Sequence, residues 1–147
     1  MKENAVSPDE ALLCEIYKSV TMGSDSVTTI IGKTNDKALR TDLAAQLDGY
    51  QRFVGITREK LEEKNYKIKQ ESIFAKLPAE ISINVTTMID DSSTKIAEMM
   101  INGSTMGMIE LMRKMRESVG ASGDTVKLAS DYVTFEEDNI NKMKAYL

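Results

Sequence analysis

The sequence predicts an all-α protein, a four-helix bundle built from two antiparallel helical hairpins with a long, partly helical connection between them. Three observations favour this fold. Only 2 of the 147 residues are proline, so long segments can stay helical. Apolar residues recur at helical spacing in four segments. Aromatic residues make up only 5% of the chain whereas methionine occurs 10 times, a composition that suits packed helices. Residues 1–147 are expected to form a single domain.

The first predicted helix begins at Ser7-Pro8 and ends before Gly32. Ser7 suits the N-cap, Pro8 suits the first helical position, and Glu10 completes a capping box. The apolar face of this helix comprises Leu13, Ile16, Tyr17, Val20, Val27, Ile30 and Ile31. At about 100° per residue, Ser24 falls in the centre of that face.

The second predicted helix follows a short break at residues 32–35 and frays near residues 65–70. Thr34 or Asn35 is the expected N-cap. The apolar face comprises Leu39, Leu43, Leu47, Tyr50, Phe53, Val54 and Leu61. Gln46 and Thr57 lie inside this face, so both are expected to point into the bundle.

The connection at residues 71–91 is compatible with two structures. Residues 77–80 resemble a helix start, and the apolar residues that follow fit one face of a helix. Residues 81–85 also alternate between apolar and polar, as a strand would. We expect a helix there, with a bend or a new helix start at residues 90–93.

The third predicted helix begins near residues 90–93 and ends at residues 120–123, and the fourth runs from about Asp124 to the C-terminus. The inward face of the third comprises Ala97, Ile101, Met108, Leu111, Met112, Met115 and Val119, with Ser104 at its centre. The inward face of the fourth comprises Val126, Ala129, Val133, Ile140, Met143 and Leu147, with Glu136 in its middle. A carboxylate at an inward position is unusual for a bundle core.

A polar layer is predicted at mid-height. The triplet at residues 21–23, Thr-Met-Gly, returns at residues 105–107. Folding each hairpin about its turn brings Ser24 level with Gln46, and brings Glu136 within about a turn of Ser104. We therefore expect Ser24, Gln46, Ser104 and Glu136 to form a polar layer inside the bundle.

Two interpretations of this layer remain open. The four side chains can form a hydrogen-bonded layer that fixes the register of the helices, despite the cost of burying a carboxyl group. They can also line a small pocket for a ligand or a single cation. If Glu136 is buried without a cation, its pKa should be raised.

Many kinds of catalytic chemistry are excluded by composition, although chemistry that uses carboxylates alone is not. The chain has no histidine and a single cysteine, Cys14. Serine–histidine and cysteine–histidine pairs are therefore absent, and a zinc site lacks the thiolates or imidazoles that it needs. No glycine-rich loop follows a predicted strand, so no phosphate-binding loop is expected. We assign no catalytic residue, no cofactor and no metal ligand.

The pattern resembles the ferritin-like superfamily, in particular its small bacterial branches. The resemblance is carried by the two hairpins, the long middle connection, the polar layer, and the run at residues 39–43 continued by Gln46, Tyr50 and Phe53. Di-iron members of that superfamily place a Glu on each of two helices and Glu-x-x-His on each of the other two.

The resemblance implies the ferritin-like fold without its di-iron centre. Ser24 and Ser104 stand at the two single-Glu positions. Gln46 and Glu136 stand at the starts of the two Glu-x-x-His motifs, and Gly49 and Asn139 occupy the histidine positions. One inward carboxylate cannot neutralise two iron ions.

We expect a non-catalytic bundle that acts as a structural or protein-interaction module. The alternative is a bundle that binds a metal or a small ligand through its polar layer, as a degenerate relative of the di-iron oxidoreductases. Homo-oligomerisation through helix faces is expected, because residues 73–89 add apolar surface. The net charge of −4 disfavours nucleic acid as a partner. The chain contains no run of about 18 apolar residues, so no membrane span is expected. The single cysteine and the polar N-terminus favour a cytoplasmic location.

Overall fold

The computed structural model describes residues 6–68 and 92–147, and every regular element in these two ranges is helical. The elements are α1 (Pro8–Ile31), α2 (Lys37–Glu63), α5 (Ser93–Glu117), α6 (Gly123–Met143) and a short 3-10 helix, η1 (Lys144–Tyr146). The predicted all-α class is confirmed for the described part of the chain. The helix or strand expected at residues 71–91 lies outside the described residues.

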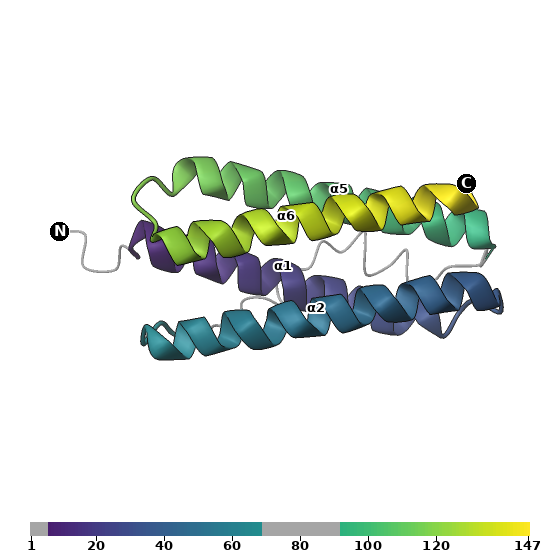
Figure 1. Cartoon of the computed structure of the whole chain (residues 1–147), viewed down its shortest axis with the longest axis horizontal. Coiled ribbons are helices and arrows are strands. Elements are labelled where there is room, and N and C mark those ends of the chain that lie inside the picture. Colours follow the sequence, from purple (N-terminus) through teal and green to yellow (C-terminus); the bar gives the residue numbers. More distant parts are fainter. Residues whose placement is uncertain (1–5, 69–91) are drawn as a thin grey trace.

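The four long helices lie side by side along one axis (Figure 1). In that view α1 leads away from the end marked N, α2 returns alongside it, and α5 and α6 form the other pair. Helix α1 packs against all three other long helices, whereas α2 packs mainly on α1 and touches α6 only sparsely. No helix within the described ranges is both long and apolar enough to cross a membrane.

The starts of the helices follow their capping residues. Ser7 Oγ accepts a hydrogen bond from Glu10 N at 3.1 Å, which confirms the predicted start of α1. The N-cap of α2 is Asp36, whose Oδ1 accepts from Leu39 N at 3.1 Å. The prediction of Thr34 or Asn35 at this position is wrong, because the Thr34 hydroxyl is used to accept from Asp36 N.

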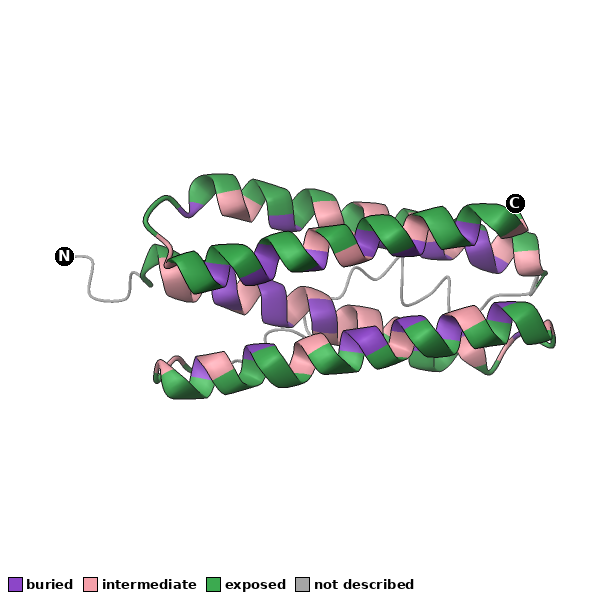
Figure 2. Ribbon diagram, in the orientation of Figure 1, coloured by how far each residue is buried: buried purple, intermediate pink, exposed green. Residues whose placement is uncertain are grey.

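The core is built from the inward faces of the helices (Figure 2). Its fully buried side chains include Leu12, Leu13, Ile16, Val20, Val27, Leu39, Leu43, Ile96, Leu111 and Tyr132. The prediction fails around the turn between α5 and α6, and also at the C-terminus, where Leu147 was expected inside but is exposed to 65%. Met112 on α5, Val119 after it and Val126 on α6 were expected inside but are exposed, Val119 to 83%. Among the described elements α5 is flanked by α1 and α6, so only a narrow stripe of it is covered.

A charged network at one end of the bundle ties three helices together. Lys64, at the C-cap of α2, donates through Nζ to Asp9 at 2.9 Å and to Asp124 at 3.1 Å. The same ammonium donates to the hydroxyls of Ser122 at 2.8 Å and Thr125 at 3.0 Å. One lysine therefore fixes the end of α2 against the starts of α1 and α6.

The opposite end of the bundle is fixed by two hydrogen bonds to carboxylates. Tyr146 donates through its hydroxyl to Asp42 at 2.6 Å, and Ser93 donates to Asp36 at 2.7 Å. These bonds join η1 and the start of α5 to α2. With both ends fixed, the residues at mid-height are held at defined levels.

Candidate functional site

A buried carboxyl group lies at the centre of the bundle. Glu136 on α6 is only 2% exposed. The phenol of Tyr50 on α2 donates a short hydrogen bond to Oε1 of Glu136, and Asn139 donates to the same oxygen at 3.4 Å. Ser104 on α5 is also buried, at 4% exposure, and its hydroxyl acts to lower the pKa of the Tyr50 phenol. Three helices therefore contribute to one polar cluster, Tyr50, Ser104, Glu136 and Asn139.

Burial changes the acidity of this cluster. Loss of contact with water raises the pKa of Glu136 to about 7, against the opposing effect of the hydrogen bonds from Tyr50 and Asn139. Burial also raises the pKa of Tyr50 well above its ordinary value, and the nearby charge of Glu136 adds to this. The cluster thus has one group that changes its charge near neutral pH, the carboxyl group of Glu136.

A second polar pair lies beside the cluster. Ser19 on α1 and Tyr132 on α6 share a hydrogen bond of 3.0 Å between their hydroxyl oxygens. The ring of Tyr132 lies 5.3 Å from that of Phe53, and the ring of Tyr50 lies 4.9 Å from that of Phe135, both in edge-to-face contact. The aromatic rings hold the two phenols in place, so each hydroxyl points in a defined direction.

The repeated Thr-Met-Gly triplet supplies two close approaches between helices. A β-carbon on Gly23 would lie 2.2 Å from the Tyr50 ring, so this glycine makes room for that ring. A β-carbon on Gly107 would lie 3.3 Å from Ser19 Oγ and 3.4 Å from Glu136 Oε2. Glycine at these two positions therefore lets α1 and α5 come close to the polar groups.

A groove of about 620 Å³ leads from the surface to these groups. It runs between α1 and α5. Its polar base comprises Ser19, Tyr50, Ser104, Tyr132 and Glu136. Its apolar walls comprise Met22, Ile30, Met99, Met100 and Met106. Apolar walls around a few convergent polar groups are typical of sites for small organic molecules.

The four residues of the predicted layer occupy different places. Glu136 and Ser104 meet at the groove. Gln46 is 2% exposed and lines a separate cavity between α2 and α6, together with Asn139. Ser24 is half-buried and is not among the residues that line either cavity, and its carbonyl oxygen accepts from Thr28 Oγ1 at 2.7 Å. Ser19 on α1 reaches the polar base of the groove, where it hydrogen-bonds with Tyr132.

Sequence reasoning named Asn139 and Ser104 near Glu136 but did not identify the phenol that donates to it. Tyr50 was assigned to an apolar face, and Tyr132 and Ser19 were not singled out. Spacing within α6 carried a usable signal, because Tyr132 and Asn139 stand four before and three after Glu136 and so share its face. The contributions of Tyr50 and Ser19 depend on packing between helices, for which the sequence offers no local pattern.

The cluster is better suited to hydrogen bonding than to holding a metal ion. Within residues 6–68 and 92–147, no three His, Cys, Asp or Glu side chains come together as ligands for a metal. The groups nearest to Glu136 are phenols, an amide and a hydroxyl, which are weaker ligands for divalent cations than carboxylates or imidazoles.

Comparison of the chain with protein-family models, with curated proteins and with solved structures finds no match in any of the three.

Proposed function

We propose that this chain is a non-catalytic, ferritin-like bundle of two antiparallel hairpins that binds a small organic molecule in the groove between α1 and α5. The observation that carries this proposal is the position of Glu136. A buried carboxyl group forms part of the base of a groove whose apolar wall residues are four methionines and one isoleucine. Burying an ionisable group costs stability, so the presence of a carboxyl group at the base of a groove favours a role in binding.

The chemistry of the groove favours an amine with an apolar body. Its charged lining residues are Glu15, Glu110 and Glu136 against Lys18, an excess of negative charge. Both hydrogen bonds to Glu136 end on Oε1, which leaves Oε2, on the side of Gly107, for a donor from a ligand. An ammonium group would pair there with the carboxylate away from bulk water, where the attraction is strong. The flexible methionines would adapt to the apolar part.

Binding is favoured over catalysis because the cluster contains a single group that titrates near neutral pH. A general acid–base reaction of the common type uses two groups with separated pKa values. Here the pKa of Tyr50 is raised well above 10, which leaves this phenol protonated and acting as a hydrogen-bond donor to Glu136.

Calorimetric titration with hexylamine tests the proposal, with hexanol and hexanoate as ligands of the same length. The amine should bind, and the alcohol and the carboxylate should bind more weakly or not at all. Glu136→Gln should weaken amine binding by roughly tenfold or more, since it removes a charge-assisted hydrogen bond. The matched control is Glu137→Gln, because Glu137 is the exposed neighbour on α6. Equal affinity in wild type and Glu136→Gln, or equal binding of amine and alcohol, would refute the proposal.

A second candidate function is self-association, favoured by an apolar row on α5. Met106, Ile109 and Met112 follow each other at three-residue spacing, and each is exposed to 47–48%. An exposed apolar row on a helix suits an interface with the same row of a second copy. Sedimentation should give a dimer that Ile109→Glu dissociates. The control is Ile56→Glu, at an exposed position on α2. A monomer at all concentrations would remove this candidate.

A further inference from the structure

The side-chain amide of Gln46 is buried without a hydrogen bond. Gln46 is 2% exposed, and within the described part of the chain neither Oε1 nor Nε2 has a partner. An unpaired buried amide destabilises a protein, because both its donor and its acceptor lose water and gain nothing in return. A ligand that accepts from Nε2 and donates to Oε1 would remove this cost.

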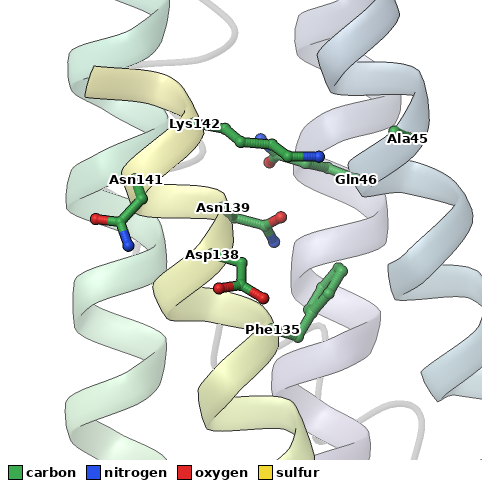
Figure 3. Close-up of a pocket in the computed structure, with 7 residues that line it drawn as sticks. All are labelled: Ala45, Gln46, Phe135, Asp138, Asn139, Asn141 and Lys142. Atoms are coloured by element: carbon green, nitrogen blue, oxygen red, sulfur yellow. The ribbon is translucent and has the colours of Figure 1, made fainter. Parts of the chain in front are cut away.

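A cavity of about 380 Å³ lies beside this amide, between α2 and α6. Its lining includes Ala45, Gln46, Phe135, Asp138, Asn139 and Lys142. Figure 3 shows Gln46 extending from α2 toward α6, and Lys142 and Asn139 extending from α6 toward α2, with Asp138 on the same stretch of α6. A water molecule accounts for about 30 Å³ of liquid volume. The cavity can therefore hold a small organic molecule.

Two opposite charges at the cavity are not paired with each other. Asp138 and Lys142 stand four residues apart on α6, with the acidic residue first, a spacing that commonly gives an ion pair. Pairs of this spacing do form elsewhere in the described chain, as between Lys127 and Asp131 at 2.8 Å. Among the described residues, however, neither the carboxylate of Asp138 nor the ammonium of Lys142 has an ion-pair or hydrogen-bond partner. A carboxylate and an ammonium are thus both available beside the amide of Gln46.

We infer that the cavity between α2 and α6 binds a small zwitterion, a molecule with an ammonium and a carboxylate group on a short spacer, as in an α-amino acid. The carboxylate of the ligand pairs with Lys142 and accepts from Gln46 Nε2. Its ammonium pairs with Asp138 and donates to Gln46 Oε1. The site is separate from the groove between α1 and α5, so the inference does not rest on the function proposed above.

Nuclear magnetic resonance of ¹⁵N-labelled protein tests this inference with L-alanine as the probe. The backbone signals of residues 138–142 and the side-chain NH₂ signals of Gln46 should shift and reach saturation. Alaninamide lacks the carboxylate and N-acetyl-L-alanine lacks the ammonium, so neither should give saturable shifts at the same concentrations. Equal shifts with all three compounds, or no saturable shift with L-alanine, would overturn the inference.

Variants at exposed positions make the test independent of folding. Asp138→Asn and Lys142→Gln should each weaken L-alanine binding by roughly tenfold, the effect of losing one charge-assisted bond. Glu137→Gln and Lys144→Gln are the controls. Each removes an exposed charge close to the cavity at a position that does not line it, and should leave binding unchanged.

A variant of the buried amide completes the test. Gln46→Met keeps the length of the side chain and should abolish the saturable shifts. Unchanged binding in Asp138→Asn, Lys142→Gln or Gln46→Met would contradict the assignment.

Discussion

The hydroxyl of Tyr50 on α2 donates a hydrogen bond to Oε1 of Glu136 on α6, and so links two helices that otherwise touch only sparsely. The bond persists through titration of the carboxyl group, since a phenol can donate to the neutral and to the charged form. The charged form nevertheless remains costly, because burial outweighs the two hydrogen bonds and sets the pKa of Glu136 at about 7.

The stability of the protein should therefore fall as the pH rises through this range. The folded protein holds a proton on Glu136 up to a pKa of about 7, whereas the unfolded chain releases it near the ordinary value of 4.5. Because the folded state binds more protons between these values, the free energy of unfolding decreases with pH there. The total loss is about 3 kcal/mol between pH 4.5 and 8.

Glu136→Gln replaces the titrating carboxyl group with an amide, and so removes the dependence of stability on pH that this group causes. The variant should be more stable than wild type at pH 8, by up to about 3 kcal/mol, and should lose the decline between pH 4.5 and 8. Urea denaturation at a series of pH values measures both effects. Glu137→Gln, at an exposed position, should keep the decline. A decline retained in Glu136→Gln would show that another group is responsible.

Gly23 should resist replacement by alanine although it lies inside a helix. Alanine normally stabilises a helix relative to glycine by about 0.5–1 kcal/mol. At Gly23, however, the added carbon would lie 2.2 Å from the buried ring of Tyr50, which cannot move away freely. We expect Gly23→Ala to destabilise the protein by about 1–3 kcal/mol.

Gly55→Ala provides the matched comparison. Gly55 lies inside α2, and a β-carbon there would meet nothing within 4 Å. This variant should raise the midpoint of thermal unfolding, whereas Gly23→Ala should lower it. Two shifts of the same sign would mean that Tyr50 does not occupy the space beside Gly23.

The contribution of Asp9 to stability should depend on pH in the opposite sense to that of Glu136, because it is lost as the pH falls. Burial acts to raise the pKa of Asp9, but hydrogen bonds from Ser122, Thr125 and Lys64 outweigh it and hold the pKa below the ordinary 3.8. A lowered pKa means that the stabilisation is present above pH 3.8 and disappears as the pH falls toward the folded-state value. Asp9→Asn should cost about 1–3 kcal/mol at pH 6, and the difference from wild type should shrink below pH 4.

Asp131→Asn is the control for that experiment. Asp131 pairs with Lys127 at 2.8 Å, but both side chains are more than half exposed. Pairs of this kind contribute about 0–1 kcal/mol. A loss in Asp131→Asn as large as the loss in Asp9→Asn would argue against a special role for the network around Lys64.

The sequence predicted features that depend on one helix alone. Ser7 and Pro8 mark the start of α1, because capping involves residues a few positions apart. The inward orientation of Glu136 could also be predicted, because Glu136 lies seven residues from both Ala129 and Met143 and therefore shares the buried face of α6 with them. Gln46 was placed inside by the same argument, and it is buried.

Features that depend on pairs of helices could not be predicted in this way. The apolar pattern of α1 points to Ser24, at the centre of the predicted face, and away from Ser19, which lies about 140° around the helix. That Ser19 reaches the site depends on how α1 packs against α6. The exposure of Met112 depends on which helices cover the second half of α5, and the sequence of α5 alone does not indicate which helices these are. The link between Tyr50 and Glu136 joins positions 86 residues apart.

The proton on Glu136 provides the most direct test, because it reports both burial and binding. The measurement is a ¹³C titration of the Glu136 carboxyl group, with and without saturating hexylamine. We expect a pKa near 7 in the free protein. With the amine bound we expect a clearly lower pKa, since an adjacent ammonium favours the carboxylate. A pKa near 4.5 in the free protein, or a pKa that hexylamine does not change, would contradict the account.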